Sequence, residues 1–125
     1  LINFIGGMHM IKDFEIKMWE SAKANGSKGF LEVVDKMQLW YAADTVVRVS
    51  NMPNYKNFDC KNYEITDFEI VAENNNFIQV HYIIKTEVNN EESKDLAGKF
   101  HITSTWVKNN EKPKLVFNID SRILD

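Results

Sequence analysis

The side chains that could transfer a proton or hold a ligand are concentrated in the second half of this sequence. Strand-like segments there place Tyr82, Ser104 and Trp106 in an alternation with apolar residues, and His81 and His101 in the opposite alternation. Successive side chains of a strand point to opposite faces, so the first set should face a core and the second face away from it. Proton transfer in an apolar cavity most often uses a histidine or a carboxylate. The core alternation of the last three strands contains neither, which argues against an evident catalytic pair.

A hairpin over Gly98 to Arg122 must position most of these residues. Its first strand runs from Phe100 to Lys108, and residues 109–112 (Asn-Asn-Glu-Lys) have the composition of a turn. In the returning strand, the expected core face carries Leu115, Phe117, Ile119 and Ser121, and the outer face Val116, Asn118, Asp120 and Arg122. One apolar and one mixed face are typical of an antiparallel sheet packed on a core. A β-bulge would invert this assignment locally.

The N-terminal third has the spacing of two helices. From Ile11 to Asn25, the apolar stripe comprises Ile11, Phe14, Met18 and Ala22, widened by Ile16 and Trp19. We place the charged residues largely on the opposite side: Lys12, Asp13, Glu15, Lys17, Glu20 and Lys23. Gly26 is expected to end this helix, and a second helix follows over roughly Lys28 to Lys36. The shared apolar stripe needs a sheet to cover.

Between the helices and the hairpin, the hydrophobic period changes from 3.6 to 2. The segment Gln38–Cys60 leaves two alternatives open, because Thr45–Val49 suits a strand and Ala42–Asn51 suits a short helix. Tyr63–Ala72 and Phe77–Val88 are predicted strands separated by an Asn-rich turn. With the closing hairpin they make a meander of four antiparallel strands. Helices first and strands afterwards is the α+β class, with helices on one face of the sheet.

Length and composition indicate a single domain with an ordinary core. The chain has 125 residues, a net charge of −3 and a single cysteine, Cys60. The absence of a basic patch argues against nucleic acid, and the absence of a long apolar run argues against a membrane span. One cysteine favours a reducing, cytoplasmic location and an inert thiol. We treat residues 1–10 as a tag remnant or disordered leader and 11–125 as the domain.

The order of segments resembles a known superfamily. Two N-terminal helices with a tryptophan in the first precede a variable middle, the strand Tyr63–Val71, and a second strand with Gln-Val-His-Tyr at 79–82. The chain closes with Thr-Ser-Thr-Trp-Val-Lys at 103–108, a polar turn, and Lys-Leu-Val-Phe at 114–117. This pattern is similar to the nuclear-transport-factor-2-like superfamily, in particular its SnoaL-like branch, over roughly Phe14 to Arg122. Pro113-Lys114 depart from the aromatic residue that commonly opens the last strand there.

The resemblance implies a cone-shaped, strongly curved sheet around the helices, an internal pocket and a homodimer. Some members are isomerases, cyclases or dehydratases, whereas others bind small molecules or protein partners. Ketosteroid isomerase works by placing a carboxylate base and a neutral acid in an apolar cavity. We can match neither its acid nor its base to a position in this sequence. No cofactor and no metal are implied.

Candidate site residues follow from these expectations. We assign the ligand pocket to aromatic and polar residues of the core face: Trp19, Trp40, Tyr82, Ser104 and Trp106. Ordinary core packing is the alternative for each. Asp44 is a weak catalytic candidate, with Asp67 behind it. We assign the dimer face to the outer alternation of the hairpin: His101, Thr103, Thr105, Asn118, Asp120 and Arg122.

Three functions follow in order. The first is binding of a small apolar or aromatic molecule in the cavity. The second is an isomerase, cyclase or dehydratase of the same fold, which requires an ionisable side chain in that cavity. The third is a protein-interaction module that uses the sheet face, and a cavity too small for more than a few waters would favour it.

Overall fold

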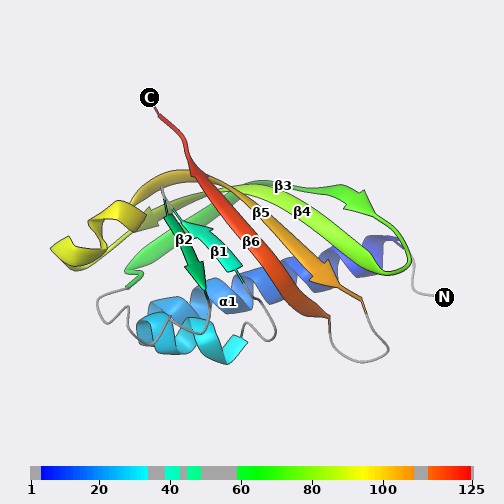
Figure 1. Ribbon diagram of the computed structural model, residues 1–125, viewed down its shortest axis with the longest axis horizontal. Coiled ribbons are helices and arrows are strands. Elements are labelled where there is room, and N and C mark those ends of the chain that lie inside the picture. Colours follow the sequence, from blue (N-terminus) through cyan, green and yellow to red (C-terminus); the bar gives the residue numbers. More distant parts are fainter. Residues whose placement is uncertain (1–3, 34–38, 43–44, 49–58, 109–112, 125) are drawn as a thin grey trace.

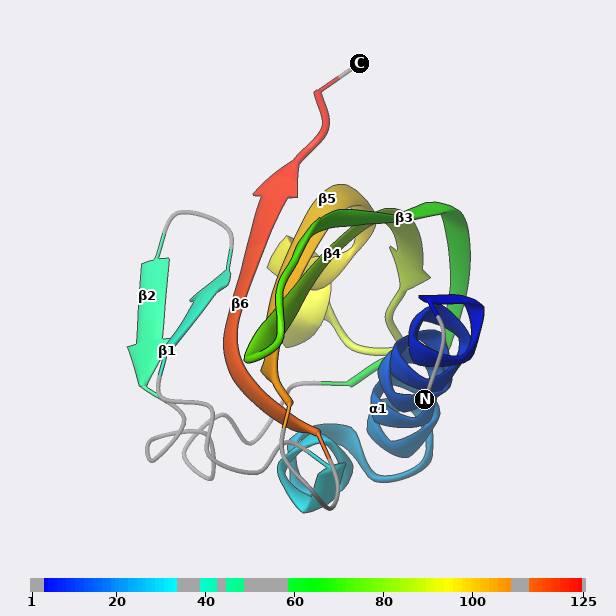
Figure 2. The same cartoon turned by 90° about the vertical axis from the view of Figure 1, so that its right-hand side faces the viewer.

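A single curved sheet covers one long N-terminal helix in the structure, which is a computed structural model. It describes the backbone of residues 4–33, 39–42, 45–48, 59–108 and 113–124, and the side chains within 10–26, 59–91, 93–108 and 113–124. The sheet has six strands in the order β2-β1-β6-β5-β4-β3. It curls around the helix in Figure 2, which confirms the α+β class with helices on one face. No helix in these ranges is long and apolar enough to cross a bilayer.

Helix α1 (Phe4–Val33) consists of two helical segments that meet at Gly26. Gly26 has φ 62° and ψ −139°, a conformation that interrupts the helix and that glycine adopts without steric penalty. The prediction that Gly26 separates two helices is confirmed. The backbone of residues 4–10, the segment set aside as a leader, is helical. Ile11, Met18 and Ala22 are buried, as the stripe predicts.

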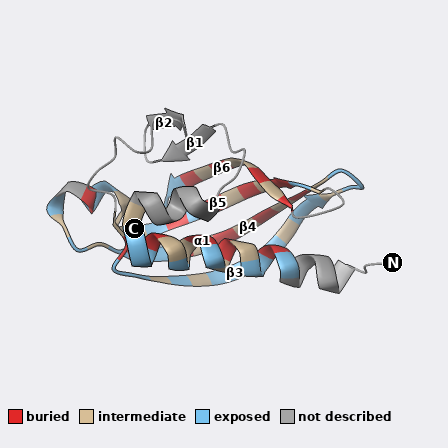
Figure 3. Cartoon of the chain, turned by 90° about the horizontal axis from the view of Figure 1, so that it is seen from below, coloured by how far each residue is buried: buried red, intermediate tan, exposed pale blue. Residues whose placement is uncertain are grey.

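The predicted meander is formed by β3 (Asn62–Glu73), β4 (Phe77–Glu87), β5 (Gly98–Val107) and β6 (Lys114–Arg122). Each strand pairs antiparallel with the next along the chain. The connection between β4 and β5 contains a short 3₁₀ helix, η2 (Glu91–Leu96). In Figure 3, the buried residues of these strands lie on the face turned toward α1.

The segment Gln38–Cys60, for which strand and helix were both possible, forms strands in its described residues 39–42 and 45–48. β1 (Leu39–Ala42) and β2 (Thr45–Arg48) make a short antiparallel pair. β1 runs parallel to β6 and pairs with its residues 117–119. Thr45–Arg48 has the expected strand propensity, whereas β1 carries no sequence signal that we recognised. This small pair extends the sheet beyond β6 (Figure 1).

A bulge in β6 reverses part of the predicted face assignment. Thr105 pairs with Phe117 and Trp106 with Leu115, so Val116 has no partner and the alternation shifts by one residue. Before the bulge, Leu115 is buried as expected. After it, Asn118 and Asp120 are buried, with 3% and 7% exposure. The assignment of these two residues to the outer face is therefore wrong, as is that of Phe117, Ile119 and Ser121 to the core.

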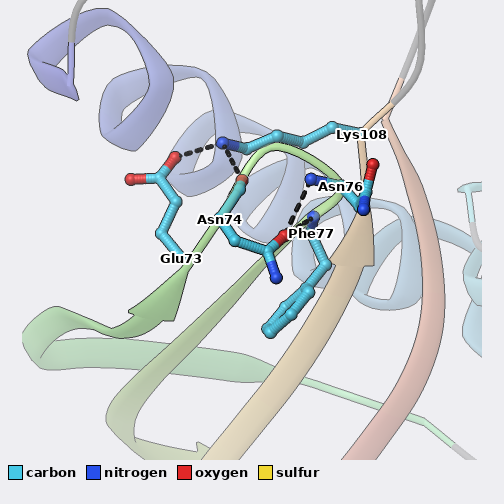
Figure 4. A network of polar contacts seen from close by, with 5 residues as sticks. All are labelled: Glu73, Asn74, Asn76, Phe77 and Lys108. Carbon is cyan, nitrogen blue, oxygen red and sulfur yellow. Dashed lines mark hydrogen bonds and ion pairs between the residues drawn. The ribbon is translucent and has the colours of Figure 1, made fainter.

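The turn between β3 and β4 is built around one asparagine side chain. Asn74 Oδ1 accepts hydrogen bonds from the backbone N–H groups of Asn76 and Phe77, at 2.7 and 3.0 Å (Figure 4). Lys108, at the end of β5, donates to the Asn74 carbonyl at 2.9 Å and forms an ion pair with Glu73. These contacts anchor the turn to the neighbouring strand end.

We expect Asn74→Ala to lower the free energy of unfolding by about 1–2 kcal/mol, because two turn N–H groups lose their acceptor. Asn75→Ala is the matched control: Asn75 is exposed in the same turn, and the change should stay within about 0.5 kcal/mol. Urea unfolding measures both. Equal midpoints for the two variants would contradict this account of the turn.

Candidate functional site

A carboxylate with no exposed surface lies between the helix and the sheet. Glu15 is 0% exposed. It occupies the same helical stripe as Ile11, Met18 and Ala22, because the spacing 11, 15, 18, 22 repeats at three and four residues. Its placement on the polar side of the helix is therefore wrong. The stripe spacing was the signal that could have found it.

Three side chains of the sheet donate hydrogen bonds to Glu15. Tyr82 Oη donates to Oε1 at 2.5 Å and Trp106 Nε1 donates to Oε2 at 2.7 Å. Ser104 also hydrogen-bonds to the carboxylate. A carboxylate can accept several such bonds, which makes its burial tolerable.

A second ring of donors fixes the direction of these bonds. Trp19 Nε1 donates to Tyr82 Oη at 2.9 Å, and Asn118 Nδ2 donates to Ser104 Oγ at 2.7 Å. An indole N–H only donates, so the Tyr82 oxygen accepts from Trp19 and its own proton points to Glu15. We call Glu15, Tyr82, Trp106, Trp19, Ser104 and Asn118 the buried polar network.

Burial and hydrogen bonding act in opposite directions on Glu15. Burial raises the pKa of Glu15 above its usual value, and the bonds from Tyr82, Ser104 and Trp106 offset part of that rise. Burial likewise raises the pKa of Tyr82 well above its usual value, and the charge of Glu15 raises it further. Tyr82 therefore keeps its proton and acts as a donor at neutral pH.

Asp120 brings a second carboxylate to the concave side of the sheet. The bulge at Val116 turns Asp120 inward, where its charge contributes to the raised pKa of Tyr82. Asp120 lies in the wall of a small cavity between α1 and the sheet, with a volume of about 20 Å³. Its described lining is mainly apolar: Trp19, Asp59, Cys60, Ile84, Thr86, Leu96, Phe100, Ile102 and Asp120. This volume holds about one water molecule, which is the cavity size expected to favour a protein-interaction module over a ligand-binding domain.

Polar groups of the lining have hydrogen-bond partners within the protein. Asp59 accepts hydrogen bonds from the backbone N–H of Asn89 at 3.0 and 3.1 Å, and Thr86 Oγ1 donates to the carbonyl of Leu96. Burial raises the pKa of Cys60 to about 11, so this residue is a thiol at neutral pH. A protonated, buried thiol is a poor nucleophile, which agrees with its predicted inert character.

The structure divides the predicted pocket residues. Tyr82, Ser104 and Trp106 lie on the core face, as expected, but their polar atoms belong to the buried polar network. Of the five, Trp19 lines the cavity described above. Asp44 and the side chain of Trp40 lie outside the described residues. Asp67, the reserve candidate, lies in a β3 irregularity with φ 56° and lines a groove on the outer face.

The outer face keeps part of the predicted dimer surface. Outward-facing residues include His101, Thr103 and Thr105 of β5, with Ile83 of β4 and Ile119 of β6. Arg122 instead lies at the rim, where its guanidinium stacks on the Phe100 ring at 4.6 Å and donates to the carbonyls of Asp95 and Ala97. The outer groove has a volume of about 420 Å³ and is lined by Glu64, Thr66, Asp67, Ile83, Lys85, Lys99 and Ile123.

His81 and His101 both lie on this face, as their alternation predicts, and they are in contact. His81 Nε2 lies 3.0 Å from His101 Nδ1, and His81 Nδ1 lies 3.6 Å from Glu69 Oε1. Within the described ranges, no three His, Cys, Asp or Glu side chains converge as metal ligands would.

We expect Glu15→Gln to lower the free energy of unfolding by about 1–3 kcal/mol at pH 5, because an amide NH₂ would face a donor of the network. Asp13→Asn, on the exposed side of the same helix turn, should change it by less than about 0.5 kcal/mol. The pKa of Glu15 is raised on folding, so the wild type loses stability as pH rises above about 4.5. The deficit of the glutamine variant should therefore shrink between pH 5 and 8. Urea unfolding across this range tests the sign, and a growing deficit would show that the donors outweigh burial.

No protein-family model and no curated protein matches the sequence. Solved structures match it closely in fold. An NTF2-like protein of Cytophaga hutchinsonii has 13% identity and a TM-score of 0.75, covering 98% of this chain and 100% of that one. A candidate Ca/calmodulin-dependent kinase II association domain of Exiguobacterium sibiricum has 8% identity and a TM-score of 0.76, covering 100% and 99%.

Aln2 of a Streptomyces species is similar at 9% identity and a TM-score of 0.72, covering 98% of this chain and 94% of that one. Identities this low show that the fold is shared, and they carry no information about activity. The curved antiparallel meander over an N-terminal helix, and its agreement with these structures over nearly the whole chain, show that this protein has the nuclear-transport-factor-2-like fold.

Proposed function

We propose that this domain binds a small apolar or aromatic molecule between α1 and the sheet, with Asp120 as the polar anchor. The observation that carries this proposal is a carboxylate, 7% exposed, in the wall of a mainly apolar cavity. Ligand sites typically combine an apolar lining with a few placed polar groups. The aromatic rings of Trp19 and Phe100 in the same wall suit a planar ligand.

The size of the cavity constrains how a ligand enters. About 20 Å³ accommodates a water and no more, so an aromatic molecule requires wall side chains to move apart. Trp19, Asp59 and Leu96 are the half-buried residues of the described lining, and the others are buried. The buried polar network holds Trp19 through a single bond to Tyr82.

Proton-transfer catalysis is the second candidate function, and Asp120 favours it. An enzyme of this fold needs an ionisable group in the cavity, and the bulge supplies one that sequence alternation did not place there. Asp120 would act as general base toward a bound ligand. Glu15 is enclosed by protein donors and would position Tyr82 without touching the ligand.

We also propose that two copies of the chain associate through the outer sheet face. The face combines half-buried apolar side chains, such as Ile83 and Ile119, with β-propensive threonines. The outer groove carries Glu64 and Asp67 beside Lys85 and Lys99, so a two-fold related copy can place opposite charges together. The structural likeness to an association domain supports the same arrangement. One cysteine in the sequence supports a cytoplasmic location.

Native mass spectrometry of gently purified protein tests the ligand site. We expect the wild type to retain a small additional mass, and Asp120→Asn to retain at least about ten-fold less, because the anchor loses its charge. Ser121→Ala changes the adjacent, exposed residue and should retain as much as the wild type. Equal retention in all three would remove Asp120 from the site.

Size-exclusion chromatography with light scattering tests the association face. We expect a dimer at micromolar concentration for the wild type and a monomer for Ile119→Lys, because the introduced charge would be buried in the interface. Asn75→Lys, at the exposed β3–β4 turn, should remain dimeric. A wild-type monomer would refute the proposed dimer.

A further inference from the structure

The two imidazole rings on the outer face meet with one ring nitrogen of each facing the other. His81 Nε2 and His101 Nδ1 are 3.0 Å apart, the distance of an N–H···N hydrogen bond. The ring centroids are 5.1 Å apart with planes inclined by 27°. If the two nitrogens point at each other, the centroid separation should be close to the nitrogen–nitrogen distance plus the distance from each nitrogen to its own ring centre. The observed separation agrees with this arrangement.

Glu69 favours one tautomer of His81. It lies on the opposite edge of His81, with Oε1 3.6 Å from Nδ1. The carboxylate favours a hydrogen on that nitrogen, which leaves His81 Nε2 as the acceptor and His101 Nδ1–H as the donor. The order Glu69–His81–His101 then crosses strands β3, β4 and β5.

The number of protons determines whether this contact survives. With both rings neutral, one N–H lies between them. A first added proton goes to the far nitrogen of His101 and strengthens the donor, which keeps the contact. A second added proton places an N–H group and a positive charge on the facing edge of each ring. The two edges then repel each other and the hydrogen bond between the rings is lost. Imidazoles ordinarily change charge between pH 5 and 8, whereas carboxylates do so near pH 4.

The charged groups around the pair are few in the described part of the chain. On β3 they are Glu69, which faces His81, and Glu64 and Asp67 further along; on β4 and β5 they are Lys85 and Lys99 at the groove. The outward positions of β6 opposite this region are Ile119 and Ser121, which are uncharged. The negative charge of Glu69 therefore offsets the positive charge of one protonated imidazole. The charge of a second protonated imidazole has no described acidic side chain facing it.

We infer that the His81–His101 pair makes self-association through the outer sheet face acid-sensitive: loss of the shared proton contact on double protonation separates the two copies. This inference rests on the proposed dimer. The pair lies among the outward residues Thr103, Ile83 and Thr105, within the face that a second copy would cover. Bringing two doubly charged pairs into one interface costs both repulsion and desolvation.

The test measures the dimer dissociation constant at pH 7.5 and pH 5.0 by light scattering and sedimentation. We expect the wild type to dissociate at least about ten-fold more readily at pH 5.0, with unchanged far-ultraviolet circular dichroism. In His101→Asn the side-chain amide replaces the Nδ1–H donor without a titratable group, so the two values should agree within about two-fold. His9→Gln, which changes the remaining histidine, should behave like the wild type.

The outcomes separate the inference from the dimer itself. A wild-type monomer at pH 7.5 overturns both. A dimer that is equally stable at both pH values, or His101→Asn protein that is as acid-sensitive as the wild type, overturns the inference alone. Nitrogen-15 spectra of the imidazole rings provide a readout that packing alone would not change: one shared proton at pH 7.5, lost at pH 5.0. Absence of the shared proton at pH 7.5 would also overturn the inference.

Discussion

The hydrogen bonds to Glu15 are the constraint on which the arrangement of helix and sheet depends. A carboxylate without exposed surface is tolerable only where donors surround it, and here they come from β4 and β5 while the acceptor comes from α1. Sliding the helix along the sheet would leave an acceptor and at least two donors buried without partners. The network therefore fixes the register of the two layers, which apolar contacts alone leave free to slide.

One unpaired residue in β6 decides what the two faces of the sheet present. The bulge at Val116 turns Asn118 and Asp120 inward and Phe117 and Ile119 outward. Inside, Asn118 completes the network through Ser104, and Asp120 enters the cavity wall. Outside, apolar side chains join the threonines and histidines. The same irregularity thus provides both the anchor of the proposed ligand site and the apolar part of the proposed association face.

The two faces differ in how they treat polar groups. On the concave side, the polar atoms of the network have partners of fixed direction, because two indole N–H groups can only donate. On the convex side, the facing nitrogens of the histidine pair lie 3.0 Å apart, and an imidazole nitrogen can either donate or accept. The first arrangement suits rigid positioning of a core and a small ligand. In the second, both rings remain partly accessible to solvent, which the proposed acid sensitivity requires.

The sequence by itself determined the elements, because hydrophobic period, Gly26 and the Asn-rich turns act locally. It predicted the helical break, the four-strand meander and the inward phase of Tyr82, Ser104 and Trp106. Glu15 also falls on the stripe 11, 15, 18, 22, although its charge is typical of an exposed position. Only the tertiary structure decided the face of Asp120, the pairing of β1 with β6, and the donors that satisfy Glu15. A bulge is a property of two paired strands, and a buried charge is set by neighbours 67 and 91 residues away in the chain, which no local pattern encodes.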